Sequence, residues 1–344
     1  MVERASTPPG LPWDSHLPEQ LPYRVSEHEQ LLKRFRNRTA FTVSDDKRLS
    51  LYQNEIITLA RSNPVLMHTI LTVTLMHDRF LSPTRNYRRS AVEAYHCYRA
   101  STSLQEQLAR PLGLAEQAAL WTSTALLGII VFAQLDADTP DEVWPLAPCS
   151  TPKVDWVRIG QGKSGVYQIT PLLHEDPVFG PLTVIQNPEK EFKLTTGLTL
   201  GQLPRPFIRL YGLDDHGTDE FNLYRPALRR LARALDPKCH PVKVVMDFWG
   251  FTNMKPEFKA LLDDRDPRAL LILAYWYMRV NQLGVWWLRP RTVLEGRAIC
   301  AYLEQYSSDD PDLRSLLQFP KASFGPRDEP LKATIEPKSG FLWS

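Results

Sequence analysis

The sequence predicts an all-α fold, a multi-helix bundle, on three observations. Apolar residues recur at helical spacing in successive segments, the first of them carrying Leu49, Tyr52, Ile56 and Leu59. A capping residue followed by proline marks helix starts, as in Asn63-Pro64 and Asp266-Pro267. Alternating strand patterns and hairpin signals are missing from the sequence.

The helical segments give the expected organisation of the chain. A flexible, proline-rich tail covers residues 1–30, a helical ligand-binding or regulatory domain covers 31–306, and a polar tail covers 307–344. An irregular insertion of prolines, glycines and threonines is expected at about 171–206. The expected helices cover residues 65–81, 86–108, 114–135, 226–235, 242–251, 256–262, 267–287 and 291–306, with another beginning near Val154.

Composition narrows the function classes. The 344 residues include 41 Lys and Arg against 39 Asp and Glu, so no net field favours nucleic acid. The four cysteines are far apart and show no CxxC spacing, which favours a reducing compartment. The N-terminus has no apolar run of the secretory kind. We therefore expect an intracellular protein, in the cytoplasm or nucleus.

One uncharged stretch, residues 117–135, approaches the length that crosses a bilayer. It contains two glutamines and several hydroxyl side chains, and it lacks a flanking cluster of lysine and arginine. We therefore interpret it as a helix buried in a large core, and we expect no membrane span.

The sequence contains several partial motifs for nucleotide, metal or acid–base chemistry, but their residue spacing does not match the spacing that each motif requires. Gly160–Ser164 resembles a phosphate loop, but the required glycine five residues before Gly162 is a valine. Asp263–Asp266 lacks the second carboxylate of a DDxxD magnesium motif, because Pro267 stands there. Asp214–His216 is interpreted as a solvated turn, and His68 and His77 point to different faces of one helix. We expect no metal and no cofactor.

The order of several segments resembles a known family. The run LYQNEIITLARSNPVLMHTILTVTLMHDRFL (Leu51–Leu81) resembles the opening of the fungal-specific transcription factor domain, through Pro64, Leu66, Met67, His68, Ile70, Leu71, Leu75 and His77. Tyr95-His96 and the Trp156 region with Gly160 resemble its next landmarks. Two further stretches are similar to the regulatory domain of sterol-uptake regulators among the zinc-cluster factors. One is LYGLDD followed by YRPALRRLARAL, and the other is residues 256–280 followed by 286–306.

The resemblance spans about residues 30–310 and implies a helical bundle with a hydrophobic ligand pocket. It departs from the family at the N-terminus: no cysteine precedes Cys97, so the zinc cluster that reads DNA is missing from this sequence. DNA binding is therefore not expected. Aromatic residues that suit an apolar pocket are Phe248, Trp249, Tyr275, Trp276 and Trp286, although an ordinary helical core uses the same residue types.

Two functions remain open from the sequence. The first is a stand-alone domain that binds a hydrophobic molecule of the sterol or terpenoid class and acts in transcriptional regulation through partner proteins or as a homodimer. The second is an enzyme of fungal secondary metabolism, a cofactor-independent cyclase or pericyclase that holds its substrate in a reactive conformation. The sequence identifies no catalytic residue for this second function.

Overall fold

The computed structural model describes residues 25–82, 88–147, 156, 165–183, 203–213, 222–251, 255–306 and 309–325. Within these ranges every regular element is a helix, which confirms the predicted all-α class. The N-terminal half contains α1 (Val25–Arg34), the π-helical turn η1 (Phe35–Thr39), α2 (Ala40–Val43), α3 (Asp46–Gln53), α4 (Glu55–Ser62), α5 (Pro64–Leu81), α6 (Ala91–Leu108) and α7 (Leu114–Ala133).

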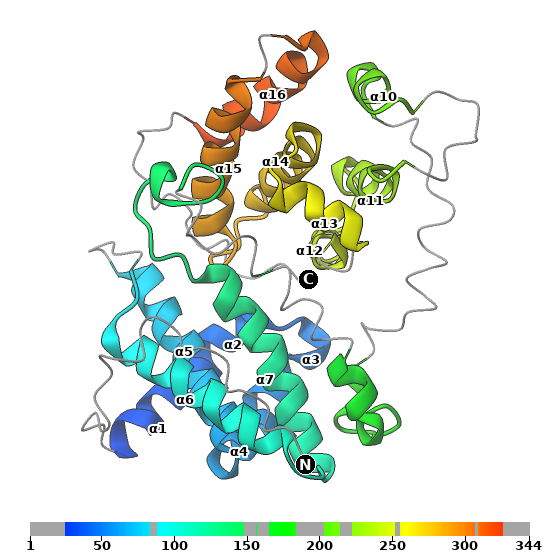
Figure 1. Ribbon diagram of the computed structural model, residues 1–344. Coiled ribbons are helices and arrows are strands. Elements are labelled where there is room, and N and C mark those ends of the chain that lie inside the picture. The colour runs from blue at the N-terminus through cyan, green and yellow to red at the C-terminus, as the bar shows by residue number, and fades with distance from the viewer. Residues whose placement is uncertain are drawn as a thin grey trace, which may run out of the picture.

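Short 3-10 turns connect this half to the rest: η2 (Pro140–Glu142), η3 (Pro171–Leu173) and η4 (Gly180–Leu182). The C-terminal half contains α10 (Arg205–Tyr211), α11 (Arg225–Leu235), α12 (Pro241–Phe251), α13 (Pro256–Asp263), α14 (Pro267–Asn281), α15 (Arg289–Glu304) and α16 (Pro311–Phe324). Helices α1–α7 occupy the lower part of the molecule and α10–α16 the upper part (Figure 1).

The helix starts follow the sequence signals. Asn63 caps α5 by accepting a hydrogen bond from the N–H of Leu66 at 3.1 Å, with Pro64 at the first helical position. Asp266 caps α14 in the same way, accepting from Ala269 N at 2.8 Å. Because the cap side chain satisfies an N–H that the helix cannot, these residues define where each helix begins.

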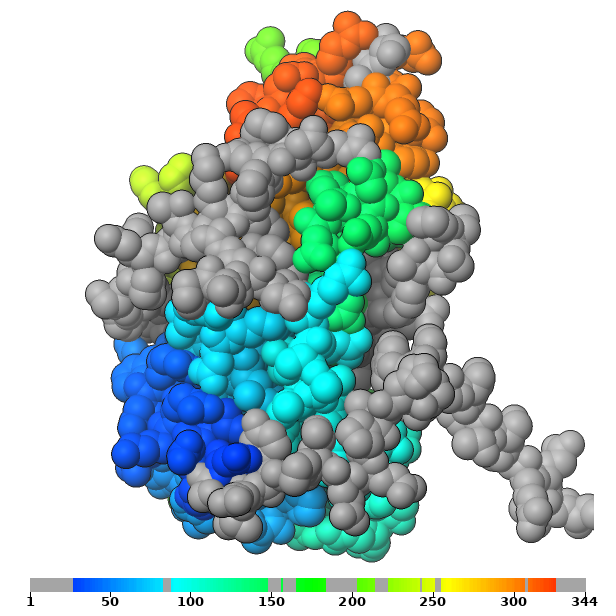
Figure 2. Space-filling model, turned by 90° about the vertical axis from the view of Figure 1, so that its left-hand side faces the viewer, coloured from blue at the N-terminus to red at the C-terminus, as the bar shows by residue number. Residues whose placement is uncertain are grey.

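One hydrophobic core joins the two halves. Helices α5 and α7 contribute Leu66, Ile70, Ile130 and Phe132 to the same buried cluster that contains α12, α14 and α15 residues. A smaller cluster attaches the 135–147 connector to α15 through Leu135, Val143, Val293 and Leu294. On the face seen in Figure 2, the connector (green) lies where the lower and upper halves meet.

The tail predicted at 307–344 is wrong in part, because α16 occupies Pro311–Phe324. Asp310 caps this helix, and a helical stripe is buried, comprising Leu313, Leu316, Leu317, Pro320 and Phe324. The proline content suggested a tail, but Pro311 sits at the first turn, where the missing N–H has no consequence. At the other end, α1 begins at Val25, inside the predicted N-terminal tail.

Two other boundaries differ from expectation. The helix predicted over 267–287 ends at Asn281, and the chain turns at Gly284, whose φ of 72° suits glycine. The predicted insertion contains the turns η3 and η4, and α10 begins at Arg205, just before its expected end. The helix expected near Val154, the Gly160–Ser164 run and Asp214–His216 lie outside the described residues, apart from Trp156.

Among the described residues, α7 is long and apolar enough to cross a membrane by length and composition. Of its most apolar window, 61% is buried inside the protein. Gln117 of this helix is buried and donates from its amide to Leu112 O at 3.1 Å. This is the environment of a core helix, where polar side chains find protein partners.

Candidate functional site

The C-terminal end of α7 meets the C-terminal half in a cluster of aromatic rings. Phe132 is fully buried at its centre. Its ring lies within 6.4 Å, centroid to centroid, of five other rings, those of Trp156, Phe248, Trp249, Tyr277 and Trp287. All five contacts are edge-to-face, the arrangement that the ring quadrupole favours.

Three of the five predicted ligand-binding residues belong to this aromatic cluster. Phe248 and Trp276 are fully buried, with ring centroids 5.9 Å apart. Trp249 is partly buried and stacks on Trp287 at 6.1 Å and 20°. These side chains come from α12, α14 and the turn before α15.

The other two predicted residues lie elsewhere. Tyr275 faces α10 and α16: its ring is 4.9 Å from Phe207, and its hydroxyl donates to Leu316 O at 2.8 Å. Trp286 faces the N-terminal half, where it stacks on His77 at 4.6 Å and donates from Nε1 to Thr42 Oγ1 at 2.9 Å. Successive helical residues differ by about 100°, so Tyr275 and Trp276 are directed to different neighbours.

A buried polar triad, Tyr277–Glu295–Arg291, lies beside the aromatic cluster and is not among the residues predicted from the sequence. The Tyr277 hydroxyl donates to Glu295 Oε2 at 2.6 Å, and Arg291 forms an ion pair with Glu295 Oε1. Arg291 and Glu295 are four residues apart, a spacing that places them on one helix face. That signal is visible in the sequence, but nothing in the pattern indicates that the pair is buried.

Arg291 also ties the two halves together. Its Nε donates to Phe132 O at 2.7 Å and its Nη2 to Gln134 O at 2.8 Å. The guanidinium carbon lies 5.5 Å from the centroid of the Phe132 ring. A cation here satisfies the last carbonyls of α7 and complements the negative end of its dipole.

Burial sets the protonation chemistry of the triad. It raises the pKa of the Glu295 carboxyl, opposed by the charge of Arg291, and it raises the pKa of Tyr277 well above its usual value. The arrangement can hold a proton between oxygen atoms beneath aromatic rings. It contains no serine or cysteine in the position of a nucleophile activated by a base.

The aromatic cluster contains a buried indole donor that suits a ligand. Nε1 of Trp287 is buried, and no acceptor lies within hydrogen-bond distance of it among the described residues. Buried indole N–H groups usually have a partner, because burying an unmade hydrogen bond costs about 1–3 kcal/mol. The Trp287 N–H is therefore suited to a ligand oxygen.

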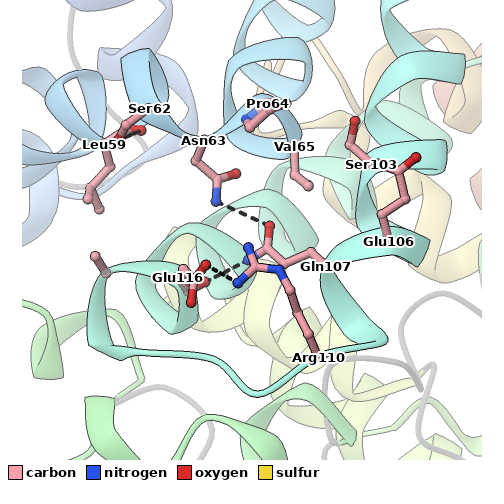
Figure 3. A pocket seen from close by; sticks show the side chains of 11 residues that line it. Leu59, Ser62, Asn63, Pro64, Val65, Ser103, Glu106, Gln107, Arg110 and Glu116 are labelled. Atoms are coloured by element: carbon pink, nitrogen blue, oxygen red, sulfur yellow. Dashed lines mark hydrogen bonds and ion pairs between the residues drawn. The ribbon is translucent and has the colours of Figure 1, made fainter.

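Two polar features lie outside the aromatic cluster. A pocket of about 210 Å³ opens where the N-termini of α5 and α7 meet the C-terminal end of α6 (Figure 3). His68 of α5 and His96 of α6 approach with their Nδ1 atoms 2.9 Å apart, near His28 of α1. Within the described part of the chain, no group of three or more His, Cys, Asp or Glu side chains could hold a metal ion.

Comparison with known proteins gives no match among family models, curated proteins or solved structures. The fungal transcription factor domain therefore stays a resemblance carried by the residues quoted above.

Proposed function

We propose that this protein is a stand-alone small-molecule-binding domain that acts in transcriptional regulation. Its ligand is a hydrophobic molecule of the sterol or terpenoid class that carries a hydroxyl or carbonyl oxygen. It binds at the aromatic cluster and contacts the Trp287 N–H. The domain works inside the cell, in the cytoplasm or nucleus, through a partner protein or a second copy, and it does not itself bind DNA.

The observation that carries this proposal is a large aromatic surface beside the buried indole N–H of Trp287, which lacks a hydrogen-bond acceptor among the described residues. Apolar ligand sites are lined mostly by hydrophobic and aromatic side chains, with a few polar groups that fix orientation. The aromatic cluster supplies the first feature, and the buried Trp287 Nε1 supplies the second. By contrast, the buried indole of Trp121 donates within the protein, to Leu182 O at 2.9 Å.

The position of the cluster favours regulation. It lies between α7 of the N-terminal half and α12, α14 and α15 of the C-terminal half, and Arg291 links the same elements. A ligand that separates or tightens these rings changes how the halves pack, and it shifts the protein toward the arrangement it binds better. The near balance of 41 basic and 39 acidic residues supports action through protein contacts instead of nucleic acid.

The test is a titration of tryptophan fluorescence with a sterol and with its 3-deoxy hydrocarbon analogue. Trp287→Phe keeps an aromatic side chain but removes the N–H, so it should weaken binding of the hydroxylated ligand about tenfold more than binding of the hydrocarbon. Trp121→Phe is the matched control, because its indole lies about 16 Å along α7 from Phe132 and already has a partner. Equal binding of both ligands to both variants would contradict the proposal.

The enzyme alternative rests on the triad. Glu295 is buried beside aromatic rings, and burial raises the pKa of its carboxyl, which moves the group toward the protonated form that proton delivery to an olefin requires. Aromatic faces stabilise a developing carbocation. Incubation with candidate terpenoid substrates and mass analysis of the products separates the two functions: a regulator returns its ligand unchanged, and a cyclase returns an isomer.

A further inference from the structure

The pocket at the meeting point of α5, α6 and α7 is chemically unlike the aromatic cluster. Its lining combines hydroxyl, amide, carboxylate and guanidinium groups with a few aliphatic side chains, and comprises Leu59, Ser62, Asn63, Pro64, Val65, Ser103, Glu106, Gln107, Arg110, Ala115 and Glu116. At about 210 Å³ it is smaller than the roughly 300–1,000 Å³ of pockets for drug-sized ligands. A ligand here must be small and largely polar.

Hydrogen bonds among the lining residues hold the pocket open. Asn63 Nδ2 donates to Gln107 Oε1 at 3.1 Å, and Gln107 Nε2 donates to Glu116 O at 3.0 Å. Figure 3 shows these bonds linking the start of α5, the end of α6 and the start of α7, with the Arg110–Glu116 ion pair alongside. Asn63 and Gln107 are both buried, so the frame is fixed by well-packed side chains.

Two long helices begin at this pocket, and each has N–H groups that the helix itself cannot satisfy. In α7, the Glu116 carboxylate accepts from Gly113 N at 2.9 Å, but the N–H groups of Ala115 and Glu116 precede the first acceptor within the helix. In α5, Asn63 satisfies Leu66 and Met67, which leaves the N–H of Val65. Orphan donors at helix N-termini bind anionic oxygens, helped by the positive end of each dipole.

A second observation is independent of the helix ends. Ser103 lines the pocket with only 9% of its surface exposed, and its hydroxyl makes no hydrogen bond with any described residue. Neighbouring hydroxyls of α6 bond back into the helix, as Ser101 does to Cys97 O at 3.1 Å. A serine that is nine-tenths buried at a polar pocket, with a hydroxyl that bonds no described residue, suits a ligand atom that completes it.

The charged side chains that line the pocket indicate which charge the rest of the ligand should have. Arg110 and Glu116 neutralise each other as an ion pair. Glu106 lines the pocket and is exposed, and its carboxylate has no cation partner among the described residues. A ligand that presents a carboxylate to the helix N-termini therefore meets a negative group that suits an ammonium. Leu59, Val65 and Ala115 leave room for an aliphatic portion.

We propose that this pocket is a second binding site, specific for a small zwitterion of the free α-amino acid class with an aliphatic side chain. Its carboxylate binds the N–H groups of Val65, Ala115 and Glu116, and its ammonium binds Glu106. The Ser103 hydroxyl completes the contact. The site is separate from the aromatic cluster and stands whether or not that cluster binds a ligand.

Calorimetry on the full chain tests the proposal with leucine as the probe. Two analogues each lack one charge: 4-methylpentanoate has no ammonium, and isoamylamine has no carboxylate. We expect leucine to bind with Kd at or below about 1 mM and each analogue to bind at least tenfold more weakly. Binding of 4-methylpentanoate as tight as that of leucine, or no heat from leucine up to about 10 mM, overturns the proposal.

Variants locate the site. Glu106→Gln removes the charge from an exposed side chain and should weaken leucine binding about tenfold, with the binding of 4-methylpentanoate unchanged. Ser103→Ala should weaken it severalfold. Ser101→Ala, an exposed hydroxyl on the same helix, is the control and should bind as the wild type does. Leucine binding that is indifferent to both Glu106→Gln and Ser103→Ala places the ligand elsewhere and overturns the assignment.

Discussion

The two halves of the molecule bury their polar side chains in different chemical forms. In α1–α7, one arginine–carboxylate pair, Arg79–Glu93, accompanies buried histidines: His68 meets His96, and His77 Nδ1 lies 3.1 Å from Thr39 Oγ1. In α10–α16, the buried pairs join arginine to carboxylates, as in Arg233–Asp247 and Arg291–Glu295. The single histidine that the structure describes between residues 203 and 325 is exposed.

This difference gives the halves opposite responses to acid. Burial lowers the pKa of His68 to about 4 and of His96 and His77 to about 3, so the folded state resists the protons that the unfolded chain accepts below 6.5. Burial raises the pKa of Asp247 and Glu295, so the folded state accepts protons more readily there. Acid therefore weakens the N-terminal half specifically.

The largest effect on stability should come from replacing Arg291, the arginine whose side chain links the two halves. Arg291→Ala leaves Glu295 buried without its cation and frees the carbonyls of Phe132 and Gln134. We expect a loss of about 3–5 kcal/mol in the free energy of unfolding, measured by urea denaturation.

The control is Arg61→Ala, which removes an ion pair with Glu29 whose two side chains are about half exposed, and which should cost less than about 1 kcal/mol. The double variant Arg291→Met/Glu295→Leu should be more stable than Arg291→Ala, because no uncompensated charge remains. An Arg291→Ala protein as stable as Arg61→Ala would show that the halves are held by apolar contacts alone.

The next effect concerns pH. Stability should be flat above about 6.5 and fall between 6.5 and about 4 as the depressed histidines are forced to accept protons, at up to about 1.4 kcal/mol per pH unit for each. His77→Phe keeps a ring against Trp286 and removes one titrating group, so its stability should fall less steeply. Urea titrations at several pH values measure both slopes.

His240→Gln, at an exposed position, is the control for replacing a histidine. If His77→Phe follows the wild type between pH 6 and 4.5, the histidines do not govern acid stability. Hydrogen exchange at pH 4.5 sharpens the comparison, because amides of α5 and α6 should lose protection before those of α14 and α15.

The sequence predicts the long helices well because their signals are local. Asn63-Pro64 and Asp266-Pro267 place caps and prolines within a single turn, and the structure begins helices at those positions. The polar, proline-rich composition after residue 307 predicts a tail, but Asp310-Pro311 carries the same cap signal and begins α16. The buried stripe from Leu313 to Phe324 was the stronger observation.

The candidate site is less predictable because its contacts are not local. Phe132 and Trp287 are 155 positions apart in the sequence, and only the packing of α7 under the C-terminal half brings their rings together. Sequence pattern identifies Tyr275 and Trp276 as aromatic neighbours but does not specify which of them faces which helix. The orphan N–H of Trp287 and the polar pocket of α5–α7 depend on the same tertiary packing.

The smallest expected effect on stability concerns α16 and tests whether this helix unfolds together with α14 and α15. Asp310 Oδ1 accepts from the N–H groups of Asp312 and Leu313, both at 3.0 Å, so Asp310→Ala should cost about 0.5–2 kcal/mol. This helix supplies acceptors to the core, Leu316 O for the Tyr275 hydroxyl and Phe324 O for Arg297 Nε at 2.9 Å. Fraying of α16 should therefore reach α14 and α15.

Hydrogen exchange measures how far the fraying of α16 extends into the neighbouring helices. In Asp310→Ala, amides of α14, α15 and α16 should exchange faster, while those of α5 and α6 keep their wild-type rates. Asp309→Ala changes a neighbouring exposed carboxylate that is not the cap and should alter stability by less than about 0.5 kcal/mol. Faster exchange confined to α16 would show that this helix is an independent appendage. Faster exchange across α5 and α6 as well would show that the halves unfold as one unit, and that the difference in their buried chemistry does not divide the protein into separately stable parts.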